Sequence, residues 1–252
     1  MEARLAGCGR ATTGMPLSAM VAQRSRHQSG PDPHDDVRAL YARVAARYGV
    51  CGRTTRAYVA SKLRRDPVHA AVLALARPLG LGVVLDAGCG RGQMGIALLE
   101  AGLARAVLGL DCVAARLAET RRAAAGLAFG VAAQDLASGK ALPPADTVLM
   151  IDVLYQLAPA VQRQVIASAA RAARRAVLIR ALDPDRGWRS ALTLGFERLT
   201  RHLSPHAGRH VAPLPVAEIA ATFRLAGFAV DVTPCWGGTP FSNVLLIATR
   251  LA

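Results

Sequence analysis

Aromatic side chains are scarce in this sequence and make up only 4% of its 252 residues. Proteins that hold single-stranded nucleic acid stack bases on aromatic rings, so the scarcity argues against such a substrate. Lysine is almost absent too, since Lys62 and Lys140 are the only lysines among 31 basic residues. With abundant alanine, this is typical of a GC-rich coding bias, which offers one explanation of the net charge of +14. The other is a basic face that attracts nucleic acid, an anionic lipid surface or an acidic carrier protein.

Long hydrophobic runs are also missing, although 52% of the residues are apolar. No stretch of about 18 apolar residues escapes interruption, so we expect no membrane-spanning helix and leave only peripheral membrane contact open. The five cysteines form no C-x-x-C pair, which favours a reduced, cytoplasmic protein without structural zinc. The four-residue spacing of His202, His206 and His210 is interrupted by Pro205 and Gly208, so we expect no metal site there.

The N-terminal third divides into two parts. Residues 1–34 are rich in Gly, Ser, Arg, Pro and Thr and contain only two acids, Glu2 and Asp32, which predicts a disordered extension. A transit peptide and an over-extended start are both compatible with that composition. Residues 35–80 show helical periodicity in three short segments, the last opened by Asp66 and Pro67.

The stretch from Gly82 to Asp111 carries the strongest local signal. A buried strand ends at Asp86, alternate glycines follow, and helical spacing resumes at Gln93. Glycines without side chains let backbone N–H groups and the start of a helix face a ligand directly. A second strand then delivers Asp111 at its carboxyl end, where a carboxylate can accept both hydroxyls of a ribose. The unit predicts an adenosine-binding half of a doubly wound sheet.

Two cofactors compete for this turn. Gly90, Gly92 and Gly95 fit the dinucleotide fingerprint G-x-G-x-x-G, but its first glycine should directly follow the strand, and Gly90 comes too late. The run from Val84 to Gly92, VLDAGCGRG, closely resembles motif I of class I S-adenosylmethionine-dependent methyltransferases. A glycine turn without any ligand is the remaining alternative.

This resemblance implies a fold and a cofactor. The fold is a Rossmann-like, doubly wound α/β structure whose seven-stranded sheet has the order 3-2-1-4-5-7-6. Residues 35–80 would form a helical lid, residues 81–252 the S-adenosylmethionine-binding domain, and residues 183–212 a cap inserted after the fifth strand. In this family the acid at Asp86 helps to fix the methionine amino group, and the acid at Asp135 accepts from the adenine amino group. The full set of cofactor-binding candidates is Asp86, Ala87, Gly88, Cys89, Gly90, Gly92, Gln93, Asp111, Cys112, Gln134, Asp135, Leu136, Ile151 and Asp152.

The acceptor side is less defined. Neither an Asn-Pro-Pro-Tyr motif nor a Pro-Cys nucleophile follows the fourth strand, which argues against the methyltransferases that use them on nucleic-acid bases. If the acceptor must lose a proton, the candidates for a catalytic base are Asp152, Tyr155 and Asp183. The candidates for substrate contact are Tyr41, Tyr48, Arg56, Tyr58, Arg180, Asp185, Trp188 and Trp236.

The sequence thus predicts methyl transfer from S-adenosylmethionine to a small acceptor, free or carrier-bound. Short pieces such as Gly187-Trp188-Arg189 and Gly238-Thr239-Pro240-Phe241 resemble a bacterial subgroup associated with aryl polyene and lipid-pigment gene clusters, which implies an aryl, polyketide or lipid-type acceptor. The alternatives are an RNA or other nucleic-acid methyltransferase, favoured by the charge, and a noncatalytic nucleotide-binding protein.

Overall fold

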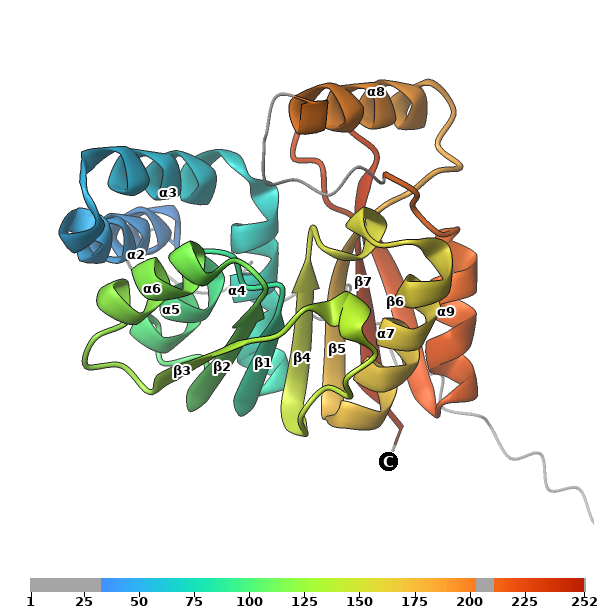
Figure 1. The fold of residues 1–252 in the computed structure, drawn as a ribbon, viewed down its shortest axis with the longest axis horizontal. Helices are drawn as coiled ribbons and strands as arrows, with labels where there is room; N and C mark the ends of the chain where they lie inside the picture. The colour runs from blue at the N-terminus through green and yellow to red at the C-terminus, as the bar shows by residue number, and fades with distance from the viewer. Residues whose placement is uncertain (1–32, 203–210, 252) are drawn as a thin grey trace, which may run out of the picture.

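The computed structural model describes residues 33–202 and 211–251. The chain folds as one sheet with helices on both faces (Figure 1). The helices and 3-10 turns are α2 (Pro33–Arg47), η1 (Tyr48–Cys51), α3 (Arg53–Arg65), α4 (Pro67–Leu79), α5 (Gln93–Glu100), α6 (Ala114–Ala123), η2 (Leu136–Ser138), η3 (Leu154–Gln156), α7 (Pro159–Ala172), α8 (Trp188–His202) and α9 (Val216–Leu225). The strands are β1 (Val83–Ala87), β2 (Ala106–Asp111), β3 (Phe129–Ala133), β4 (Ala145–Ile151), β5 (Ala173–Leu182), β6 (Phe228–Pro234) and β7 (Asn243–Arg250).

The strand order is β3-β2-β1-β4-β5-β7-β6, which confirms the topology expected from the sequence. Strands β1 to β5 pair in parallel, whereas β7 runs antiparallel to β5 and β6. The order reverses between β1 and β4, where the chain crosses from one half of the sheet to the other. In open α/β sheets this switch point is where the carboxyl ends of the strands leave a crevice for a ligand.

Alternation along the strands sends side chains into two cores. In β1, Leu85 packs into a core with α7 and α9, and Val84 packs into a core with α2 to α5. The same alternation recurs in β5, where Ile179 and Leu178 take opposite faces. Because side chains on a strand alternate in direction, a sheet covered on both faces needs such nearly continuous apolar strands.

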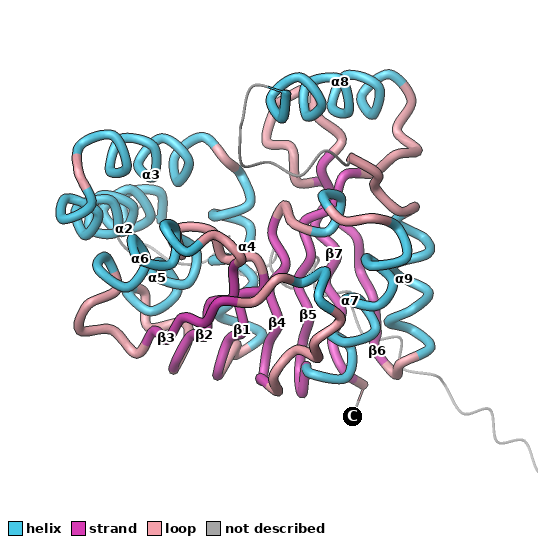
Figure 2. Tube along the Cα trace, viewed as in Figure 1, coloured by secondary structure: helices cyan, strands magenta, loops and turns pink. Residues whose placement is uncertain are grey.

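The N-terminal helices share a core with the sheet. Tyr48, Leu63 and Val72 pack in the same cluster as Val84 of β1. The helices therefore form a continuous structure with the sheet, and α3 lies beyond the carboxyl ends of β1 and β2 (Figures 1 and 2). On the other half of the molecule α8 lies beyond the ends of β5 and β7.

Two expectations concern parts of the chain that the structure does not describe. The extension of residues 1–34 falls almost wholly outside the described residues, and so do residues 203–210 of the expected cap. The amphipathic piece expected within the cap is seen as α8, which begins at Trp188 and so includes three residues more at its N-terminal end than the expected Ala191. Within residues 33–202 and 211–251, no helix is both long and apolar enough to cross a membrane.

Helix α9 offers a matched test of the core. Phe223 is fully buried and packs edge-on against Phe228, with ring centroids 5.7 Å apart. We expect Phe223→Ala to lower the free energy of unfolding by about 3 to 5 kcal/mol, because it leaves a cavity under the sheet. Leu225→Ala, two residues away and 91% exposed, should change it by less than about 0.5 kcal/mol. Urea unfolding followed by circular dichroism measures both, and equal losses would contradict the packing described.

Candidate active site

A cavity of about 690 Å³ lies at the carboxyl ends of β1, β2 and β4. We call it the main cavity. Its walls come from the glycine turn after β1, the loops after β2, β3 and β4, helix α3, the start of α4, and Glu197 of α8. Of the cofactor-binding candidates, all but Ala87 and Gly92 line it: Asp86, Gly88, Cys89, Gly90, Gln93, Asp111, Cys112, Gln134, Asp135, Leu136, Ile151 and Asp152. The fold thus gathers side chains as far apart in the sequence as Tyr58 and Glu197 around one space.

The glycines of the turn do different things. All three have positive φ, at 87° for Gly88, 59° for Gly90 and 73° for Gly92. A Cβ on Gly88 would lie 2.7 Å from Val153, and one on Gly92 would lie 2.4 Å from Thr120, so these two glycines allow close packing. A Cβ on Gly90 would meet nothing within 4 Å. Since Gly90 lines the main cavity, it is the glycine that keeps the backbone open to a ligand.

Asp111 fastens the glycine turn to the neighbouring strand. Its Oδ2 accepts from the Gly90 amide at 2.9 Å, and its Oδ1 accepts from the Val113 amide at 2.8 Å. The Leu110 carbonyl also accepts from the amides of Gly88 and Cys89, at 2.8 and 2.9 Å. Each carboxylate oxygen has a second lone pair, so Asp111 can hold the turn and accept hydroxyl groups from a ligand at the same time.

Asp86 is the most deeply buried acid of the site. Its side chain is 2% exposed at the end of β1, yet it borders the main cavity. Burial, together with the negative charge of Asp111, raises the pKa of Asp86 to about 7. A carboxyl held in this way is poised to lose its proton when a cation arrives beside it.

The third-strand loop provides one more acid. Asp135 is exposed, and its Oδ1 accepts from the Ala137 amide at 2.8 Å, which starts the short turn η2. The side-chain amide of Gln134 donates from Nε2 to the Lys140 carbonyl at 3.3 Å. Both residues line the main cavity.

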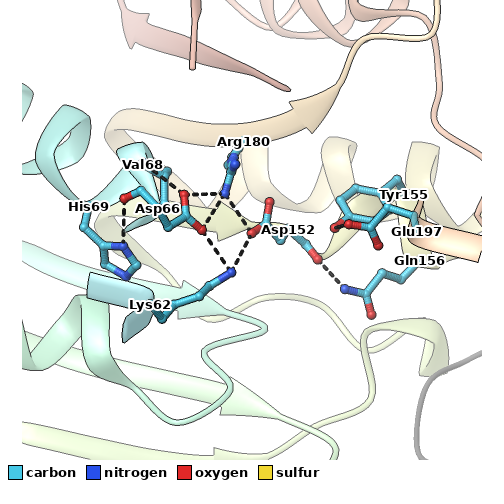
Figure 3. Close-up of polar contacts among 9 residues, drawn as sticks. All are labelled: Lys62, Asp66, Val68, His69, Asp152, Tyr155, Gln156, Arg180 and Glu197. Atoms are coloured by element: carbon cyan, nitrogen blue, oxygen red, sulfur yellow. Dashed lines mark hydrogen bonds and ion pairs between the residues drawn. The ribbon is translucent and has the colours of Figure 1, made fainter. Parts of the chain in front are cut away.

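Four charged side chains meet where the N-terminal helices join the sheet (Figure 3). We call Lys62, Asp66, Asp152 and Arg180 the charge cluster. The Arg180 guanidinium donates to both oxygens of Asp66, at 2.7 and 2.8 Å, and to Asp152 at 3.0 Å. Lys62 lies 3.0 Å from Asp66 and 3.4 Å from Asp152. Burial alone would raise the pKa of Asp66, but Arg180 and Lys62 outweigh it and lower this pKa to about 2.

Asp152 stands at an unusual point of the backbone. It is the one non-glycine residue with positive φ in residues 33–202 and 211–251, at 57°. Its carbonyl accepts from the side-chain amide of Gln156, and its carboxylate is held by the two cations of the charge cluster. Such a conformation costs about 1 to 3 kcal/mol, and these contacts hold it in place beside the cavity.

His69 lines the main cavity and was not singled out by the sequence analysis. It is buried in α4, its Nδ1 lies 3.4 Å from the Asp66 carbonyl, and its ring meets Tyr41 edge-on at 6.5 Å. Burial lowers the pKa of His69 to about 4, so the imidazole is neutral near pH 7. A single histidine in an apolar helix carries no sequence signal that separates such a position from an ordinary core residue.

The remaining catalytic candidates lie outside the main cavity. Tyr155 is buried, and its hydroxyl donates to Glu197 Oε1 at 3.4 Å. Asp183 accepts from Arg186 Nε at 2.6 Å and from the Asp185 amide at 3.0 Å, so its carboxylate organises the loop that enters α8. Of the three acids and hydroxyls singled out from the sequence, only Asp152 borders the main cavity.

The substrate-contact candidates are scattered. Tyr41 and Tyr48 are core residues, and the Tyr48 hydroxyl donates to the Arg91 carbonyl at 2.5 Å. Tyr58 is 48% exposed and borders the main cavity. Arg180 belongs to the charge cluster. The other four, Arg56, Asp185, Trp188 and Trp236, lie outside the main cavity, and Trp236 packs under the guanidinium groups of Arg186 and Arg189.

A second, smaller cavity of about 280 Å³ adjoins the main one. Tyr58 and Lys62 line both. The other walls come from the end of α3, the charge cluster, and the loop between β6 and β7 with Thr239 and Phe241. We call this the side cavity. Most of its exposed surface is apolar, and Lys62, Asp66 and Arg180 of the charge cluster also line it.

The described residues contain no group of three or more His, Cys, Asp or Glu side chains arranged to hold a metal ion. His206 and His210 lie outside the described residues, and the side chain of His202 is not described.

Residues 84–176 match the family model of a methyltransferase domain. No curated protein sequence matches the chain. The fold resembles magnesium protoporphyrin IX methyltransferase from Synechocystis PCC 6803 with bound S-adenosylhomocysteine, at 21% identity and a TM-score of 0.56, covering 93% of this chain and 94% of that one.

Two further solved structures are similar. The S-adenosylmethionine-dependent methyltransferase SibL shares 25% identity with a TM-score of 0.60, over 84% of this chain and 62% of that one. The pyocyanin biosynthetic protein PhzM shares 19% identity with a TM-score of 0.57, over 79% of this chain and 58% of that one. The chain thus spans less than two thirds of the length of both.

The family match covers the glycine turn, Asp111, Asp135 and Asp152, and the sheet around them has the strand order expected for the class. Residues 84–176 are therefore a methyltransferase domain, set in a sheet with the strand order of class I S-adenosylmethionine-dependent methyltransferases.

Proposed function

We propose that the enzyme methylates a small-molecule acceptor, an aryl, polyketide or lipid-type metabolite that is free or carrier-bound, in the cytoplasm. The observation that carries this proposal is the side cavity, whose exposed surface is largely apolar and which shares Tyr58 and Lys62 with the main cavity. A space of about 280 Å³ suits part of a small apolar molecule. Similar structures carry the names of a porphyrin methyltransferase and a pyocyanin biosynthetic protein, which agrees with a small acceptor.

The main cavity contains the groups that the cofactor requires. Asp86 would pair with the methionine ammonium, Asp111 would accept the ribose hydroxyls, and Asp135 would accept from the adenine amino group. Gln93, whose Oε1 is buried and unpartnered, begins α5, so this oxygen has a hydrogen bond to offer near the N-terminus of that helix. Bound there, the cofactor supplies a methyl group on a sulfonium ion, which an acceptor attacks in line with the breaking bond.

The protein has little covalent work to do in this reaction. Its main contributions are to hold the attacking atom in line and to keep water out, which lowers the entropic part of the barrier. If the acceptor must lose a proton, His69 and Asp152 are the cavity-lining groups placed to receive it. His69 is neutral near pH 7, whereas the Asp152 carboxylate is already paired with Lys62 and Arg180.

Gly90 and Gly102 provide a matched pair for testing the cofactor site. Both have φ near 60° and open space where a Cβ would stand, but only Gly90 lines the main cavity. Alanine at either position should cost about 1 to 2 kcal/mol of stability through backbone strain. We expect Gly90→Ala to weaken binding of S-adenosylhomocysteine at least about tenfold, since its methyl group enters the approach surface, and Gly102→Ala to leave it unchanged. Isothermal titration calorimetry measures this, and an equal loss in both variants would contradict the assignment.

Asp86 should couple cofactor binding to a proton. Its folded-state pKa of about 7 lies above the unfolded value near 4, so its contribution to stability is full below about pH 4 and is lost as pH rises through 7. The cofactor ammonium favours the anion, so binding should release up to about one proton per site at pH 6, and less at pH 8.

Calorimetry at pH 6 in buffers of different ionisation enthalpy measures that release. Asp86→Asn, which has nothing to titrate, should bind more weakly and release no proton from this position. It should also show a flatter dependence of stability on pH between 4 and 8. Release that persists unchanged in Asp86→Asn would show that another group is responsible.

The acceptor class can be tested with a labelled methyl donor. Supplied with total RNA, duplex DNA, a lipid extract and a phenolic extract, the enzyme should label a small molecule and leave nucleic acid at background. Nucleic acid should bind only weakly and with a steep salt dependence, since phosphate contacts displace counterions without reading bases.

Asp86→Asn serves as the control in that assay. Because this variant should bind the methyl donor more weakly, labelling that depends on the enzyme should be lower with it than with the wild-type chain. With the acceptor in hand, His69→Gln and Asp152→Asn then separate the two proton acceptors by their effects on kcat. Specific labelling of RNA or DNA at physiological salt would replace our proposal with the nucleic-acid alternative.

A further inference from the structure

Helix α8 presents its large apolar side chains to solvent. Trp188 is 66% exposed, Leu192 45%, Phe196 50% and Leu199 60%. Their spacing of four, four and three residues puts them on one stripe of the helix, which we call the outer stripe. A helix that covers a globular protein normally turns such residues inward.

The inward side of α8 is made of small polar residues instead. Ser190 is 3% exposed, and its hydroxyl donates to the Asp183 carbonyl at 2.7 Å. Thr193 is 2% exposed, and its hydroxyl oxygen accepts from the Ser242 amide at 2.9 Å. The helix is thus fastened to the protein by hydrogen bonds from its polar face, and its apolar face is left outward.

The neighbouring helix α3 supplies positive charge. It contains no acidic residue, and its arginines Arg53, Arg56, Arg64 and Arg65 are exposed. Both α3 and α8 lie beyond the carboxyl ends of the parallel strands, above the same edge of the sheet (Figure 1). The side cavity is lined by Arg65 of α3 and by Phe241, whose ring lies 5.3 Å from Phe196 of the outer stripe.

We propose that this face docks on an anionic membrane surface, with the outer stripe in the boundary of the acyl chains and the arginines of α3 among the headgroups. Large apolar side chains on one face of a surface helix, with arginine beside them, are what an interfacial helix requires. A patch of this kind is uncommon on a protein that works without a partner. Each arginine near an anionic leaflet strengthens binding, and α3 contains no negatively charged side chain that would oppose this attraction. The docking brings Phe241, a wall of the side cavity, close to the lipid, whichever acceptor the enzyme uses.

The test is co-sedimentation of the full chain with vesicles of phosphatidylcholine alone and of phosphatidylcholine mixed with phosphatidylglycerol. We expect binding to the anionic vesicles that weakens as salt is added. The double variant Leu192→Asp/Leu199→Asp should reduce it at least about tenfold, because two apolar anchors are lost. Arg53→Gln/Arg64→Gln should reduce binding to anionic vesicles on the order of tenfold.

A matched control is available at the opposite edge of the sheet. Leu225 and Leu251 are 91% and 62% exposed, and Leu225→Asp/Leu251→Asp makes the same change of charge and polarity. This variant should bind vesicles far better than the α8 variant, although the two carry the same net charge. S-adenosylhomocysteine binding by each variant verifies that it is folded. Failure of the wild-type chain to bind S-adenosylhomocysteine would bear on the catalytic assignment alone.

Three results would overturn the proposal. The first is that the folded wild-type chain fails to sediment with anionic vesicles. The second is that the α8 variant and its control lose binding equally. The third is that the wild-type chain is a dimer that the α8 variant dissociates, without vesicle binding, which would make the outer stripe a contact between two copies.

Discussion

The hydrogen bond from the Gly90 amide to Asp111 is the contact on which the site depends most. It joins a turn after β1 to the end of β2, and the turn can approach the carboxylate because its glycines have positive φ. The same carboxylate also accepts from Val113 at the entrance of α6, so one side chain fixes two loops. With these loops in place, Asp86 behind the turn and Asp135 after β3 face a common space.

A second constraint acts across the switch point of the sheet. The charge cluster ties the start of α4 to the ends of β4 and β5, through Asp66, Asp152 and Arg180. Such buried charges are retained only where every partner is present, since removal of one would leave the others uncompensated. The cluster therefore links helices α3 and α4 to the ends of β4 and β5 beside the main cavity.

The sequence predicted the sheet, and most of the cofactor candidates it named lie around the main cavity, because the features that indicate both are local. A strand that ends in an acid, alternate glycines and a second acid after the next strand are all read within about 30 residues, and the buried strands carry their own apolar signal. The acceptor side depends on contacts between distant parts of the chain. Tyr48 and Tyr58 both lie in helical segments before the sheet, and the sequence does not distinguish them. In the structure the Tyr48 hydroxyl donates to the backbone carbonyl of Arg91, whereas Tyr58 borders the main cavity. Asp183, a candidate base in the sequence, is paired with Arg186 and does not line the main cavity, whereas His69, which the sequence did not single out, does. Packing between distant parts of the chain decides which of the two borders the cavity.

The most direct test of the site is a crystal structure of the enzyme with S-adenosylhomocysteine bound. We predict the ribose hydroxyls within about 3 Å of the Asp111 carboxylate, the amino group beside Asp86, and the sulfur turned towards Asp152 and His69. A ligand bound in the side cavity, or one whose adenine occupies the place beside Asp86, would contradict this account of the active site.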